Sequence, residues 1–125
     1  MRYAILCYNS EAETESWSKA EDDAVLAKRA VVKKKLAAQG KLGPVFRLMP
    51  TTAATTVRAG REQLVLDGPF AETKEQLLGL YVVDCASIEE ALEIAKALPV
   101  LKSSFEVRPV RLYFPGVGLK SKEVE

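Results

Sequence analysis

The sequence predicts an α+β protein of the ferredoxin-like type, with an antiparallel sheet, two helices on one face of it and an extra β-hairpin. Two observations lead to this fold class. Apolar runs of strand length and amphipathic runs of helix length follow one another in the order strand, helix, strand, hairpin, strand, helix, strand. The chain has 125 residues, 48% of them hydrophobic, which suits a single core. We therefore expect one domain over residues 1–115 and a polar, mobile tail over residues 116–125.

The first third of the chain contains a strand and a long helix. Residues 2–8 are apolar and aromatic without interruption, which is typical of a strand buried on both faces. Residues 10–17 are polar and show no periodicity. Ser18 and Glu21 then have the spacing of a capping box, and the helix that begins there is expected to end before Gly40.

The apolar stripe of this helix includes Val25, Val32 and Leu36. Lys28 and Lys35 lie between its rows on the helical wheel. We interpret them as lysines whose aliphatic chains cover the apolar contact of the helix while their ammonium groups reach water. The alternative is that they line a polar cleft.

Short strand-like runs follow at residues 43–49, 55–58 and 63–66, and the last two form a hairpin. Asp67–Phe70, with the sequence DGPF, is a tight turn. Residues 77–85 alternate in polarity and are rich in β-formers, so they predict another strand.

The last third of the chain predicts one more helix and one more strand. Ser87 and Glu90 again have capping-box spacing, and Pro99 ends the helix. Residues 105–114 read as a strand in which the apolar phase shifts at Pro109, so we expect a bulge there.

Two helices can cover only one face of this sheet. Residues 77–85 and 105–114 carry apolar side chains in both phases, so the uncovered face is expected to be apolar as well. Pairing of two copies face to face is the simplest way to bury it, and we therefore predict a homodimer.

The composition excludes several function classes. A net charge of +1 is too small to attract nucleic acid without a segregated basic patch, so direct nucleic-acid binding is not expected. The absence of histidine removes His-based nucleophilic catalysis and imidazole metal sites. Any acid or base must therefore be a carboxylate, Lys, Tyr or Cys.

Cys7 and Cys85 are far apart in the sequence and form no CxxC motif. We predict neither a metal site nor a cofactor. The apolar run at the N-terminus is too short for a signal peptide or a membrane span, which predicts a cytoplasmic protein with no membrane partner.

Several segments together resemble the DGPF group of the YCII-related family. They are RYAILCY at the start, TTVR before the hairpin, DGPFAETKEQLLGLYVVDCA, IEEALEIAKALP and EVRPV. The resemblance covers almost the whole chain and implies a ferredoxin-like subunit that pairs into a dimeric α/β barrel. Most members similar to this one have no assigned reaction, and some are fused to, or encoded beside, extracytoplasmic-function sigma factors. Some relatives are thought to use a His–Asp pair, which this sequence without histidine lacks.

Asp67 is the principal candidate for catalysis. It ends a strand before Gly68 and Pro69, where a carboxylate held at a cleft rim would act as a general base. The alternative is a turn residue that caps its own backbone amides. Tyr8 and Tyr81, on strands expected to be neighbours, are candidate hydrogen-bond donors, although strand tyrosines more often pack their rings.

Four further residues are candidates for ligand binding. Phe70 would form one wall of a pocket or close the turn onto the core. Glu72 and Lys74 would contact a polar ligand or form part of a solvated face. Arg108 would hold a carboxylate or phosphate group of a ligand, or equally pair with Glu62 or Glu106 across strands.

The thiols of Cys7 and Cys85 are expected to be close, because both lie near the C-terminal ends of core strands that we take to be parallel neighbours. Buried free cysteines are the commoner case, and a redox pair is the alternative.

The sequence thus predicts a protein that binds an unidentified small organic molecule in a cleft, with or without cofactor-free acid–base catalysis. The alternative is a non-catalytic accessory or regulatory dimer linked to a sigma factor.

Overall fold

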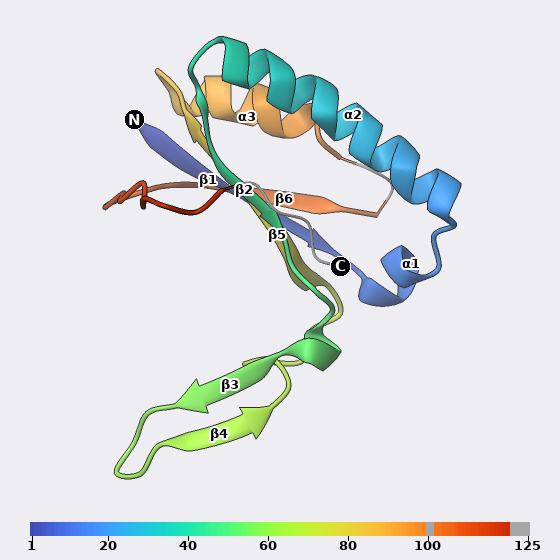
Figure 1. The fold of residues 1–125 in the computed structure, drawn as a ribbon, viewed down its shortest axis with the longest axis vertical. Coiled ribbons are helices and arrows are strands. Elements are labelled where there is room, and N and C mark those ends of the chain that lie inside the picture. Colours follow the sequence, from blue (N-terminus) through green and yellow to red (C-terminus); the bar gives the residue numbers. More distant parts are fainter. Residues whose placement is uncertain (100–101, 121–125) are drawn as a thin grey trace.

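The computed structural model describes residues 1–99 and 102–120 and confirms the ferredoxin-like prediction. Its main sheet is antiparallel with the strand order β2-β5-β1-β6. These strands are β1 (Arg2–Asn9), β2 (Leu42–Arg47), β5 (Gln76–Asp84) and β6 (Ser104–Pro109). The helices are α1 (Glu11–Glu15), α2 (Lys19–Ala38), α3 (Ile88–Lys96) and the 3₁₀ turn η1 (Thr51–Ala53). Figure 1 shows α2 and α3 on the same side of the sheet.

The predicted hairpin consists of β3 (Thr55–Arg58) and β4 (Leu64–Asp67), which form a separate sheet. We call residues 55–67 the arm. Figure 1 shows the arm extending away from the sheet and the helices. A two-stranded hairpin gains little stability by itself in water, so its connection to the body at residues 48–54 and 68–75 matters for its position.

The central strand β1 is buried on one face only, not on both as its sequence predicted. Tyr3, Ile5 and Cys7 are buried toward the helices, whereas Ala4 and Leu6, which alternate with them, are half-exposed. The difference arises because only one face of the sheet carries helices.

The capping box of α2 is present as predicted. The Ser18 hydroxyl accepts a hydrogen bond from the Glu21 backbone N–H at 3.1 Å, and the Ser18 N–H donates to the Glu21 carboxylate at 3.2 Å. Gly40, with φ of 68°, takes the left-handed conformation that follows the helix end. The short helix α1 was not predicted, although Ser10 caps it by accepting from the Glu13 N–H at 3.4 Å.

The last strand is shorter than predicted, and the bulge at Pro109 was a wrong prediction. Strand β6 ends at Pro109, beyond which Leu112 and Phe114 are 88% and 83% exposed. The Val110 N–H still donates to the Arg2 carbonyl at 2.9 Å, and the pairing ends there because Arg2 is the first residue of β1. The register shifts lie elsewhere, between Cys7 and Tyr8 on β1 and in β2.

The core lies between the helices and the sheet. Helix α3 packs on β6 and β1, and α2 packs on β2. The buried residues of this cluster are Tyr3, Ile5, Cys7, Leu36, Tyr81, Val83, Cys85, Ala91, Ala95 and Leu98. Within residues 1–99 and 102–120, no helix combines the length and the apolar character needed to cross a membrane. Of the predicted tail, residues 121–125 lie outside the described residues.

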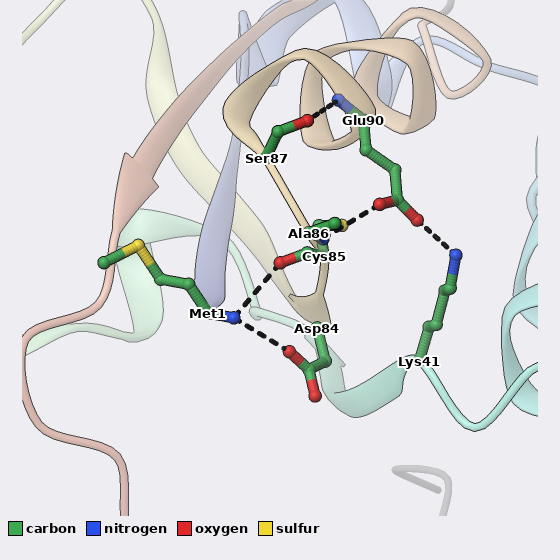
Figure 2. Close-up of polar contacts among 7 residues, drawn as sticks. All are labelled: Met1, Lys41, Asp84, Cys85, Ala86, Ser87 and Glu90. Carbon is green, nitrogen blue, oxygen red and sulfur yellow. Dashed lines mark hydrogen bonds and ion pairs between the residues drawn. The ribbon is translucent and has the colours of Figure 1, made fainter.

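The second capping box is only half formed, because its carboxylate is used elsewhere. The Ser87 hydroxyl accepts from the Glu90 N–H at 3.3 Å, as predicted. The Glu90 carboxylate, however, accepts from the Ala86 N–H at 2.9 Å and from the Lys41 ammonium instead of the Ser87 N–H (Figure 2). Both contacts lower the pKa of Glu90, and the hydrogen bond from Lys41 has the larger effect.

The N-terminus closes the same end of the sheet. The Met1 ammonium donates to the Cys85 carbonyl at 3.1 Å and to the Asp84 carboxylate at 3.3 Å (Figure 2). The Cys85 N–H donates to the Met1 carbonyl at 2.9 Å. These contacts join the start of β1 to the end of β5, next to the Lys41–Glu90 pair.

We expect Glu90→Gln to lower the melting temperature at pH 7. A carboxyl whose pKa falls on folding stabilises the fold above its ordinary pKa of 4.5, and this contribution disappears as the pH drops through the lower folded-state value. The gap between wild type and Glu90→Gln should therefore close on acidification. Glu93→Gln is the control, because Glu93 is exposed and pairs only with the exposed Lys96. Equal melting temperatures at pH 7 for wild type and Glu90→Gln would contradict this account.

Candidate functional site

A cleft of 550 Å³ lies between α2 and the helix-facing side of the sheet, at the end where β1 leads into α1. Apolar and charged side chains line it together. Its apolar and aromatic residues include Trp17, Leu26, Val45, Tyr81 and Phe105. Its charged residues are Glu11, Glu15, Arg29, Lys33 and Arg47.

Arg29 occupies a place on α2 that the helical pattern reserves for an apolar residue. Val25, Arg29, Val32 and Leu36 are spaced four, three and four residues apart, so they share the face that packs on the sheet. The Arg29 Nε atom is buried and has no hydrogen-bond partner. The guanidinium carbon lies 5.6 Å from the centre of the Phe105 ring, within cation–π range. Arg29 forms no ion pair with any carboxylate of the described residues.

The other charged groups of the cleft differ in how far they are paired. Arg47 pairs with Asp22 of α2 at 2.8 Å. The Glu11 carboxylate accepts from the Thr51 N–H at 2.5 Å and from its hydroxyl at 2.7 Å, so it is tied to η1. Lys33 is half-buried and makes no ion pair with any described carboxylate. The cleft therefore has two cations, Arg29 and Lys33, that form no ion pair with a carboxylate of residues 1–99 and 102–120.

Cys7 and Tyr81 form part of the inner surface of the cleft. Burial raises the pKa of the Cys7 thiol to about 11, although the nearby positive charge of Arg29 acts in the opposite direction. Burial likewise raises the pKa of Tyr81, again against the effect of Arg29. At neutral pH the cysteine is therefore a poor nucleophile, and the tyrosine hydroxyl keeps its proton and can donate a hydrogen bond.

The predicted catalytic residues do not meet within the chain. Tyr81 lines the cleft. Tyr8 borders it, but Tyr8 alternates with the buried Cys7 and Asn9, so its side chain points to the opposite face of the sheet. Asp67 is exposed at the end of β4, at the base of the arm, and does not line the cleft.

The predicted ligand-binding residues are also separated. Phe70 is 78% exposed, and Lys74 is exposed in the same connection between β4 and β5. Glu72 lines a second groove of 420 Å³ at the base of the arm, together with Thr51 and Gln76. Arg108 lies on β6 and pairs with Glu106, which was the alternative given for it.

The expectation that the two thiols are close was wrong. Strands β1 and β5 are antiparallel, so their C-terminal ends lie at opposite ends of the sheet. Cys7 is opposite Gly79, whereas Cys85 is hydrogen-bonded to Met1. The strand between Gly79 and Cys85 measures about 20 Å at roughly 3.3 Å per residue. Both cysteines are free and buried.

Sequence reasoning missed Arg29 and Lys33, the residues that give the cleft its charge. Of the two lysines it considered, Lys28 donates to the Pro99 carbonyl at 2.6 Å and Lys35 is exposed. The signal in the sequence that could have identified Arg29 is its position in the apolar stripe of α2, where a charged residue is unexpected. Among the described residues, no group of carboxylates and thiols is arranged to hold a metal ion.

Comparison with known proteins gives a family but no activity. The family model of the YCII-related domain, which describes the sequences of that family, matches residues 1–113 of this chain. A relative in Rhizobium meliloti (strain 1021), named Uncharacterized protein R00369, is 55% identical over 120 residues, which cover 93% of this chain and 97% of that protein.

The burial of Cys7 and Cys85 predicts slow reaction with thiol reagents. With a pKa of about 11 for Cys7, only about one thiol in a thousand is ionised at pH 8. A chromogenic disulfide reagent at pH 8 should therefore label the native protein slowly and the protein in denaturant rapidly. Fast labelling of both thiols in the native state would contradict the burial described here. Because the thiols are far apart, no internal disulfide should form in air.

Proposed function

The chain belongs to the YCII-related domain family, and we propose that it is a homodimer that binds a small organic molecule in the cleft between α2 and the sheet. The DGPF sequence at Asp67–Phe70 supports placing it in the DGPF group of that family. The observation that carries the proposal is the cleft itself: 550 Å³ of space with aromatic walls and a buried arginine Nε that lacks an acceptor.

The composition of the cleft favours ligand binding over a packing defect. Sites for small molecules are concave, mostly apolar and supplied with a few polar groups, in volumes of roughly 300–1,000 Å³. Leu26, Val45 and Phe105 supply apolar surface, and Arg29 and Tyr81 supply donors. A structural void would be lined by apolar atoms alone, without a charged group facing it.

The homodimer is supported by the face of the sheet that the helices leave uncovered. We call Ala4, Leu6, Leu80 and Val82 the outer face, since the register places them opposite one another in two pairs on β1 and β5. They alternate with the residues of the core cluster, so they point away from the helices; Ala4, Leu6 and Leu80 are half-exposed there, whereas Val82 is already buried. Apolar surface in the middle of a sheet is costly to leave in water, and a second copy presents the same surface for pairing.

Acid–base catalysis by Asp67, Tyr8 and Tyr81 is a narrower form of this proposal. In one protomer these groups lie on the arm, on the outer side of the sheet and in the cleft. A shared reaction centre would therefore need Asp67 from the partner protomer, brought in by the arm. Tyr81 is the member of the trio that a molecule in the cleft would contact.

A regulatory dimer associated with a sigma factor is the second candidate, and the arm favours it. Val57, Val65 and Leu66 are exposed on the arm, whose two strands form a sheet of their own. Exposed apolar residues on a projecting hairpin are typical of a protein contact. The resemblance to relatives encoded beside sigma factors suggests the class of partner.

We expect Leu80→Glu to dissociate the dimer. A charge in the middle of the paired outer faces would be buried without a partner, at a cost of about 3 to 5 kcal/mol. Light scattering should give twice 13.7 kDa for the wild type and a folded monomer for Leu80→Glu. Val31→Glu is the control, because Val31 is exposed on α2 and should leave the dimer intact. A wild type that is monomeric at all concentrations would overturn the dimer proposal.

Native mass spectrometry of protein purified without added metabolites tests ligand binding. The wild type should carry a non-covalent small molecule that is released on denaturation. Leu26→Trp should abolish it, because the larger side chain fills the cleft, while Val31→Trp on the exposed side of the same helix should retain it. Equal retention of the molecule by both variants would place it outside the cleft.

A further inference from the structure

We propose that the molecule bound in the cleft is an organic carboxylate with an apolar body, and that Arg29 and Lys33 hold its carboxylate. This inference rests on the proposed function, since it names the chemical class of the ligand for the same cleft. Three features of the cleft lead to it: a half-buried arginine with no ion-pair partner among the described carboxylates, a second cation one turn away, and apolar walls beyond them.

The first feature is the state of Arg29. A buried polar group without a hydrogen-bond partner is rare in folded proteins, because desolvation is then not compensated. The Arg29 Nε atom is in this position, although the residue takes a place on α2 that an apolar side chain could fill. Phe105 contacts the guanidinium through its ring, which accepts no conventional hydrogen bond. A carboxylate meets the planar fork of an arginine with two parallel hydrogen bonds, and Arg29 lines the cleft without an ion-pair partner among the described carboxylates.

The second feature is the position of Lys33. Residues four apart on a helix are neighbours on one face, so Arg29 and Lys33 both face the cleft. The third cation, Arg47, is paired with Asp22. The Glu11 carboxylate keeps its negative charge, but both of its oxygens accept hydrogen bonds from Thr51 of η1. Glu15 is exposed. The positive charge of the cleft is thus concentrated at two adjacent side chains of α2.

The third feature is the surface around these cations. Val45 of β2, Phe105 of β6 and Leu26 of α2 offer apolar contacts, and Tyr81 offers a hydroxyl that keeps its proton. A bare inorganic anion would leave these walls facing water. A carboxylate attached to an aromatic or branched aliphatic body fills both parts of the cleft, which is why we favour it over phosphate.

Binding of 2-naphthoate and 2-naphthamide tests this inference, because the two probes share an apolar body and differ in charge. Trp17 lines the cleft and is the single tryptophan of the chain, so its indole N–H gives one NMR signal that reports on the cleft. Titration of the labelled dimer with each probe then gives two dissociation constants.

In the wild type, 2-naphthoate should bind roughly ten-fold or more tightly than 2-naphthamide, because charge-assisted hydrogen bonds form only with the carboxylate. Arg29→Gln should weaken the binding of 2-naphthoate far more than that of 2-naphthamide, and so abolish this preference. Lys33→Gln, at a more accessible position, should reduce the preference and provides the test if Arg29→Gln fails to fold. Lys34→Gln is the matched control: it removes the same charge from an exposed position of α2 outside the cleft.

The outcomes separate this inference from the proposed function. Equal affinities for the two probes, or a preference that survives both Arg29→Gln and Lys33→Gln, would overturn the carboxylate inference and leave a cleft that binds neutral molecules. Failure of both probes to shift the Trp17 signal, together with no co-purified molecule in native mass spectrometry, would overturn both proposals. An equal loss of preference in Lys34→Gln would show a long-range effect of net charge and would also refute the specific contact.

Discussion

The antiparallel pairing of β1 with β5 is the constraint on which the rest of the structure depends. It places Ile5 opposite Tyr81 and Leu6 opposite Leu80, so the alternation of each strand assigns one pair to the helices and the other to the outer face. The same pairing sets the two cysteines at opposite ends of the sheet. Contacts of Met1 and Glu90 then close one end, which leaves the cleft at the other.

The two ends of the sheet differ in how completely their polar groups are satisfied. At the end that Figure 2 shows, the Met1 ammonium and the Glu90 carboxylate both have defined partners. At the cleft end, the Arg29 Nε atom has none. The polar groups around Met1 and Glu90 all have partners, as expected of a cluster that stabilises the fold. The polar atom without a partner at the cleft end is what marks that end as a candidate binding site.

Local signals explain why much of the fold was predictable. The Ser18 hydroxyl caps the start of α2 by binding the N–H of Glu21, three residues later. Gly40 follows the end of α2 in the left-handed conformation. Both helix ends therefore depend only on residues that are close in the sequence. The hairpin likewise follows from two short apolar runs around a turn. Where a long-range partner intervened, local reasoning failed: the Glu90 carboxylate binds Lys41 instead of closing its own cap.

The sequence by itself determined the fold class, the order of the six strands and of the two longer helices along the chain, and the apolar character of the central strands, because periodicity and capping act over a few residues. It also indicated the family. Only the tertiary structure decided the direction of β5 against β1, and with it the separation of Cys7 from Cys85. It alone brought Arg29 of α2 against Phe105 of β6, because a cleft is formed by side chains from strands and helices that are remote in sequence.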